Sequence, residues 1–189
     1  MVAHVSAFSL WLPILLSAVF VFVASSIIHM VLGYHAGDVK GVAKQDDLMT
    51  ALRQFNIPPG DYAVPKPDSI KDLGTPEFKA KMAKGPAVFF TVRKPGADFM
   101  GATLGVWFVY CAVVAFVAAY ITGIAYGPGA TYSQIFRMAG TAGFASFAMG
   151  LPQHSIWYGR SWRTTLISMM DGLLFGCLIG GTFGWLWPR

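Results

Sequence analysis

The sequence has 189 residues, of which 55% are hydrophobic and only 12% are charged, and its formal net charge is +5. Soluble domains carry about 25% charged residues, so the composition argues against a soluble globular protein. The small positive charge does not suggest nucleic-acid binding. Residues 8–33 and 99–136 contain no charged residue. Each run exceeds the roughly 20 residues needed to cross the hydrocarbon core of a bilayer, and we therefore expect an integral membrane protein.

The apolar stretches predict four membrane-spanning helices, over residues 8–33, 99–124, 133–151 and 165–187. The expected fold class is thus an all-α membrane protein with four transmembrane helices. The first stretch follows no basic region and is too long for a signal peptide, so it is expected to be a retained span. The third stretch is the least regular of the four, because Arg137 lies within its first turns.

A polar segment of about sixty residues, 36–98, separates the first two predicted spans and holds ten Lys/Arg and eight Asp/Glu residues. We interpret it as a cytoplasmic or interfacial insert. A short amphipathic helix is expected over about 46–55, where Asp46 or Asp47 can cap its start. The apolar residues expected on one face of this helix are Leu48, Leu52 and Phe55.

A second amphipathic helix is expected in the insert, over about 76–84. Thr75 suits the N-cap, Pro76 suits the first helical position, and Gly85 can end the helix. Its basic residues predict a helix that rests at the level of anionic lipid headgroups. These residues are Lys79, Lys81 and Lys84.

Two further motifs lie in the insert. The stretch IPPGDY, residues 57–62, has the composition of a turn, with two prolines and a glycine. The stretch PAVFFTV, residues 86–92, is consistent with a short strand or with a strip at the membrane interface.

Lys and Arg residues in the loops predict the orientation. Ten lie in residues 36–98, and Arg160 and Arg163 lie between the third and fourth predicted spans, whereas the loop after the second span has none. With four spans both basic loops share one face, so we expect them in the cytoplasm and both termini outside it. Arg160 and Arg163 lie among tryptophans and are further candidates for binding anionic lipids.

Four glycines recur every four residues in the last predicted span: Gly172, Gly176, Gly180 and Gly184. On a helix this spacing aligns them along one slowly drifting face. In a bilayer such a face lets another helix approach closely and gain van der Waals contact. The spacing does not identify the partner, which is either another helix of this chain or another subunit.

Asp171 precedes the first of these glycines, and His29 lies near the end of the first predicted span. A carboxylate in a span faces protein or water because lipid cannot solvate it. Counted from the ends of their predicted spans, the two residues lie at similar depths in the membrane. We therefore hypothesise that they meet or share a polar pocket. Such a pair could carry protons or bind a ligand, or it could be a structural hydrogen bond between helix ends.

Three histidines and a carboxylate are expected on the same side of the membrane: His29, His35, His154 and Asp38. Imidazoles and carboxylates bind metals, and two histidines can bind a haem. The spacing between His29 and His35 matches no strong ligand motif, so the sequence predicts no cofactor and leaves these four residues as metal candidates only.

Several stretches resemble an uncharacterised group of small bacterial integral membrane proteins. They are HMVLGYHAGD, IPPGDY, FVYC and SIWYGRSWRTT…DGL…FGWLWPR. The resemblance covers most of the chain and implies a bacterial inner-membrane location. It carries no activity and no catalytic residue.

The sequence contains no nucleotide-binding loop, nucleophile elbow, zinc-protease motif or convincing catalytic carboxylate pair. We therefore expect a non-enzymatic protein that is an accessory or scaffold subunit, packed against other membrane subunits or against itself. A small homo-oligomeric transporter or channel that uses Asp171 is the alternative. A haem- or metal-binding redox protein that uses the histidines is a third possibility.

Overall fold

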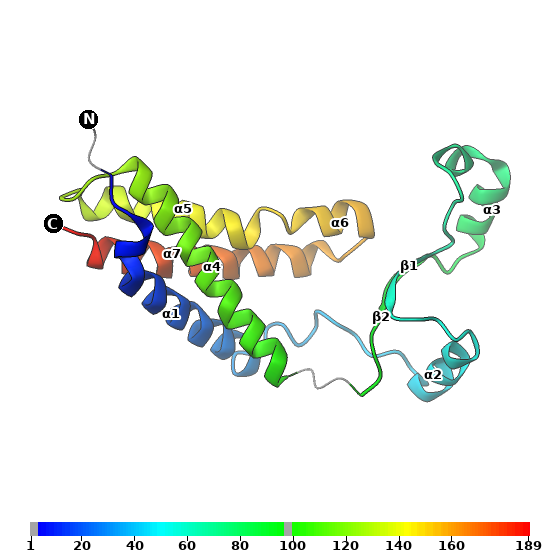
Figure 1. Cartoon of the computed structure of the whole chain (residues 1–189). Coiled ribbons are helices and arrows are strands. Elements are labelled where there is room, and N and C mark those ends of the chain that lie inside the picture. Colours follow the sequence, from blue (N-terminus) through cyan, green and yellow to red (C-terminus); the bar gives the residue numbers. More distant parts are fainter. Residues whose placement is uncertain (1–3, 97–99) are drawn as a thin grey trace. The chain divides into compact units, whose positions relative to one another are not determined.

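The computed structural model describes residues 4–96 and 100–189 (Figure 1). These residues form two compact units. One unit comprises residues up to 40 together with those from 100 onward, and we call it the membrane unit. The other comprises residues 41–96, and we call it the insert unit. Each is described by itself.

Within the described residues, three helical segments of the membrane unit are long and apolar enough to cross a membrane, judged by length and composition. The first is a 3₁₀ turn, η1 (Ala7–Leu10), that continues into α1 (Trp11–Met30). The others are α4 (Gly101–Ala125) and α7 (Trp162–Leu186). These segments support the expectation of a helical membrane protein.

The expectation of four spans needs correction, because the third predicted span does not meet the same criteria. It forms α5 (Tyr132–Ala148), whose 17 residues span about 26 Å at 1.5 Å per residue, less than a hydrocarbon core of about 30 Å. Arg137 also lies within it. Its start is well defined, since Thr131 and Gln134 form a capping box.

A further helix follows where the sequence analysis expected a plain connection. This helix, α6, spans Pro152–Tyr158 and ends at Gly159, which has a φ of 68°. Pro152 occupies its first turn, where a missing N–H costs nothing. The proline therefore begins a helix here. Both α5 and α6 lie beside α7 (Figure 1).

The chain direction alternates between α1, α4, α5 and α7. At one end of the membrane unit, the backbone N–H of Val5 donates to the carbonyl of Gly123 over 3.0 Å. At the same end, the N–H of Gly129 donates to the carbonyl of Pro188 over 2.9 Å. The start of α1, the loop between α4 and α5, and the end of α7 therefore meet there.

The four predicted glycines of α7 all face α5. A Cβ atom at Gly176 would lie 2.7 Å from the Gly140 carbonyl oxygen, and one at Gly180 would lie 2.6 Å from the Phe136 carbonyl oxygen. Real Cβ atoms do not approach backbone atoms so closely, so only glycine fits at Gly176 and Gly180 while the two helices keep this separation. Of the two partners that the sequence left open, a helix of the same chain occupies this face. The complete set is Gly172, Gly176, Gly180 and Gly184.

The insert unit contains a sheet, which corrects the all-α expectation. Strand β1 (Gly60–Val64) pairs antiparallel with β2 (Val88–Val92), with Gly60 opposite Val92. The last three residues of the predicted IPPGDY turn belong to β1. The pairing uses β-branched and aromatic residues from both strands, and a strand partner 30 residues away is invisible to local turn chemistry.

The insert helices are α2 (Gln45–Gln54) and α3 (Pro76–Lys84), with the 3₁₀ helix η2 (Ile70–Gly74) before α3. The Thr75 hydroxyl caps α3 by accepting from the Phe78 N–H over 3.2 Å. The predicted Asp cap of α2 is wrong. Lys44, with a φ of 57°, takes the N-cap position without a side-chain bond, and Asp46 and Asp47 lie in the first turn.

Adjacent glycines on α7 give a matched test of the close approach to α5. The nearest atom to a Cβ at Gly181 would be the Tyr132 hydroxyl at 3.7 Å, an ordinary contact. Gly180→Ala should therefore lower the free energy of unfolding in detergent by about 1–3 kcal/mol through overpacking, whereas Gly181→Ala should not lower it. Equal effects of the two substitutions, measured by chemical denaturation, would contradict this packing.

Candidate functional site

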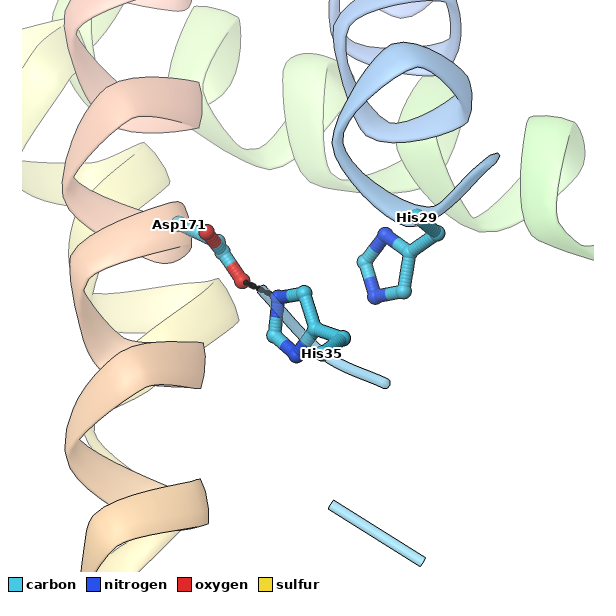
Figure 2. A group of neighbouring side chains, drawn as sticks. All are labelled: His29, His35 and Asp171. Atoms are coloured by element: carbon cyan, nitrogen blue, oxygen red, sulfur yellow. Dashed lines mark hydrogen bonds and ion pairs between the residues drawn. The ribbon is translucent and has the colours of Figure 1, made fainter. Parts of the chain in front are cut away.

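Polar side chains gather where the end of α1, the loop that follows it and the middle of α7 meet. Figure 2 shows His29 on α1, His35 on the loop and Asp171 on α7. The α1 helix ends at Met30, and Gly33, with a φ of 66°, then turns the chain. A non-glycine residue rarely adopts this conformation.

Asp171 is nearly buried, with a side-chain exposure of 7%. Its Oδ1 accepts a hydrogen bond from the Tyr34 hydroxyl over 2.5 Å, and its Oδ2 accepts one from His35 Nε2 over 2.7 Å. Both oxygens of a carboxylate on an apolar helix are thus satisfied by one loop. The carboxylate lies level with the loop that follows α1.

His35 lies between two carboxylates. Its Nε2 donates to Asp171, and its Nδ1 donates to Asp38 Oδ2 over 2.6 Å. Because both ring nitrogens face carboxylate oxygens, the geometry suits the imidazolium form, which has a donor on each nitrogen. Burial by itself lowers the pKa of His35, but the hydrogen bonds and charges of Asp38 and Asp171 outweigh it and raise the pKa above 6.5.

The neighbouring ionisable groups respond to the same arrangement. The hydrogen bond from His35 is the largest influence on Asp38, and it holds the pKa of that carboxyl below its ordinary value despite burial. Arg163, whose Nη1 lies 3.5 Å from Asp38 Oδ1, adds to this effect. Burial and the hydrogen bond to Asp171 raise the pKa of the Tyr34 hydroxyl to about 12.

His29 joins the group by stacking. Its ring lies parallel to the His35 ring, with 4.4 Å between centroids and an interplanar angle of 6°. Its Nδ1 donates to the Ser25 carbonyl over 2.9 Å, and its Nε2 is directed away from α1 (Figure 2). The ring is exposed. Ser25 in turn accepts a hydrogen bond from Trp107 Nε1 of α4 over 2.8 Å.

The pair proposed from sequence, His29 and Asp171, therefore belongs to one cluster, but the hydrogen bonds to Asp171 come from His35 and Tyr34. Tyr34 was not among the residues singled out from the sequence. The feature of the sequence that could have pointed to Tyr34 is its position next to His35. His154 lies apart on α6, where it is exposed and its ring is 5.9 Å from the Tyr158 ring centroid.

The stacking of His29 on His35 argues against a haem held between these two histidines. Two histidines that bind one haem lie on opposite faces of the macrocycle, and rings with centroids 4.4 Å apart leave no space for it. A metal ion is a different case. One ligand atom from each of His29, His35 and Asp171 lies within 4.8 Å of the others, and these residues could hold a metal.

The residues predicted to meet lipid headgroups are all exposed: Lys79, Lys81, Lys84, Arg160 and Arg163. The side chain of Arg163 is 61% exposed and also reaches Asp38. It thus connects the surface to the cluster.

No family model, curated protein or solved structure matches this chain. The fold defines the class as a mostly helical protein, and the described part of the chain has three helices that are long and apolar enough to cross a membrane. The resemblance to small bacterial membrane proteins gains no family assignment from these comparisons.

The cluster predicts how stability depends on pH in chelator-treated protein. The raised pKa of His35 means that its stabilising contribution is complete below pH 6.5 and is lost as the pH rises through the raised value. The lowered pKa of Asp38 means that its contribution is present above pH 3.8 and is lost as the pH falls through the lowered value. The other groups facing His35 are His29, Tyr34, Asp171 and, through Asp38, Arg163.

The thermal midpoint of the wild type in detergent should therefore fall as the pH is raised above about 6.5, the ordinary pKa of histidine. His35→Gln should remove most of this fall. His154→Gln, which changes an exposed histidine outside the cluster, should keep it. A His35→Gln profile parallel to the wild-type profile would show that His35 does not carry this dependence.

Proposed function

We propose that the protein is a non-enzymatic accessory or scaffold subunit of a larger membrane complex, and that its insert unit docks onto another protein subunit through α2. The observation that carries this proposal is the lack of a core: none of residues 41–96 is buried. A segment of this size needs buried apolar surface to offset the conformational entropy of folding. A partner surface would supply it.

The apolar face of α2 is the part of the insert that such a partner would cover. Leu48, Leu52 and Phe55 are 43%, 42% and 72% exposed. The charges around them are balanced, with Asp46 and Asp47 in the first turn and Lys44 and Arg53 at the two ends of the helix. An anionic bilayer attracts net positive segments, so this helix is suited to a protein surface.

The surface of α3 has a different character. Its exposed lysines, and Arg160 in the membrane unit, support contact with anionic headgroups. In this proposal the basic surfaces hold the protein near the membrane, and α2 selects the partner. A mainly electrostatic attraction would weaken with salt, whereas an apolar interface would not.

We extend the proposal to topology: α5, although shorter than a full span, returns along the bundle with α6, and both termini lie outside the cytoplasm. The alternating direction of α1, α4, α5 and α7 supports it, because α5 must return along the bundle from the end where the termini meet. The ten basic residues of segment 36–98, together with Arg160 and Arg163, then fall on the cytoplasmic side. A bacterial inner membrane remains a prediction from the resemblance.

A transporter or channel that uses Asp171 has less support. Tyr34 and His35 occupy both oxygens of this carboxylate. Farther along the bundle, Thr122 and Thr182 each donate to a carbonyl of their own helix. The shallow, mostly apolar pocket of about 200 Å³ between α5 and α7 contains Arg137 but does not include Asp171.

A pair of charges on the apolar face of α2 tests the docking. We expect the double substitution Leu48→Asp and Leu52→Asp to reduce recovery of a stoichiometric partner from native membranes at least about tenfold, since losing roughly 1.4 kcal/mol of apolar burial suffices. The matched control is Thr50→Asp, on the opposite face of the same helix, which should keep the partner.

The measurement is quantitative mass spectrometry of the complex purified in mild detergent. Wild-type protein that purifies alone, or a partner equally lost with Thr50→Asp, would contradict the proposal. Vesicle binding that depends on Leu48 and Leu52 in the absence of any protein partner would assign α2 to the bilayer instead.

A further inference from the structure

We propose that His29, His35 and Asp171 bind one divalent transition-metal ion of the Zn²⁺ or Fe²⁺ type. The proposal goes beyond the accessory role and does not rest on it. Three potential ligand atoms, two imidazole nitrogens and one carboxylate oxygen, lie within 4.8 Å of one another. This donor set suits zinc and non-haem iron, and it leaves coordination positions open for water or another ligand.

The hydrogen bond that His35 makes through Nδ1, on the side away from Asp171, is the kind that a metal-binding histidine requires. A ligating histidine donates its second ring N–H to a carboxylate or carbonyl, which fixes the tautomer and makes the other nitrogen a better ligand. His35 Nδ1 donates to Asp38 over 2.6 Å, and Arg163 lies 3.5 Å from the other oxygen of that carboxylate. His35 Nε2 is thereby directed at the site.

His29 and Asp171 have equivalent support. His29 Nδ1 donates to the Ser25 carbonyl, which leaves the lone pair of a neutral ring on Nε2. Tyr34 donates to Asp171 Oδ1, which leaves Oδ2 for a ligand. Each of the three donors is thus oriented through its other polar atom. A purely structural ion pair between His35 and Asp171 does not require this orientation of His29.

Binding requires two local adjustments. Metal–ligand distances near 2.1 Å place nitrogen and oxygen about 3.4 Å apart in a tetrahedron, so the His35–Asp171 pair, now 2.7 Å apart, opens by about 0.7 Å. Parallel stacked rings cannot both direct in-plane lone pairs at one ion, so His29 must rotate. Its exposure leaves space for that rotation.

The charge of the surroundings favours a cation. In the hydrogen-bonded state the proton on His35 Nε2 lies between the ring and Asp171. A metal ion would take the place of this proton and release it to solvent. The carboxylates of Asp171 and Asp38 together with Arg163, 3.5 Å from Asp38, would leave a net charge of −1 around the ion.

The test is metal binding by the full-length protein in detergent. The protein is stripped with a chelator and titrated with Zn²⁺ by calorimetry, with stoichiometry from elemental analysis, and Co²⁺ is used as a spectroscopic probe of the ligand set. We expect one ion per chain. His29→Gln should weaken Zn²⁺ binding at least about a hundredfold, since losing a ligand exceeds the 10–100-fold cost of losing a group behind one.

His154→Gln is the matched control, because it removes an exposed histidine outside the cluster, and it should bind Zn²⁺ as the wild type does. His29 is exposed, so His29→Gln should keep the metal-free melting temperature, which separates lost ligation from lost folding. Asp38→Asn should weaken binding by about 10–100-fold and alter the Co²⁺ spectrum only slightly. Absence of stoichiometric Zn²⁺ binding, unchanged binding in His29→Gln, or an equal loss in His154→Gln would overturn the proposal.

Discussion

The membrane unit depends on how one carboxylate on an apolar helix is satisfied. Lipid offers Asp171 no hydrogen-bond donor, and an unpartnered charge on such a helix is costly. The loop after α1 supplies both donors, Tyr34 and His35, and Asp38 from the same loop balances the charge of His35. These hydrogen bonds attach the end of α1, through the loop that follows it, to the middle of α7. They also hold the His35 ring where it stacks on His29.

The helix α7 makes two kinds of contact, one through its glycines and one through Asp171. Its glycine face lies against α5 at distances that no side chain would permit, as at Gly180. Asp171 lies beside this face and receives the loop. Because the glycine face is covered within the chain, it does not support assembly with other subunits. The support for an accessory role comes instead from the insert unit, in which Leu48 and Leu52 have no core of their own to enter.

Local sequence signals predicted some features and missed others for physical reasons. The turn chemistry around Thr75 and Pro76 indicated the bounds of α3, because caps act within one helical turn. The same reasoning failed at β1, since its partner strand lies 30 residues away, and at α5, whose 17 residues are too few for the span that was expected. The sequence placed Asp171 and His29 at similar depths. It could not show that a loop turning at Gly33 would bring His35 and Tyr34 to Asp171.

A double-mutant cycle on His35→Gln and Asp171→Asn tests most directly whether the loop is tied to α7. The free energy of unfolding is measured in detergent for the wild type, both single variants and the double variant, in the presence of a chelator. Residues in direct hydrogen-bonded contact show coupling of about 0.5–3 kcal/mol, and we predict a coupling in this range. Additive effects, with a coupling near zero, would contradict the attachment on which this account depends.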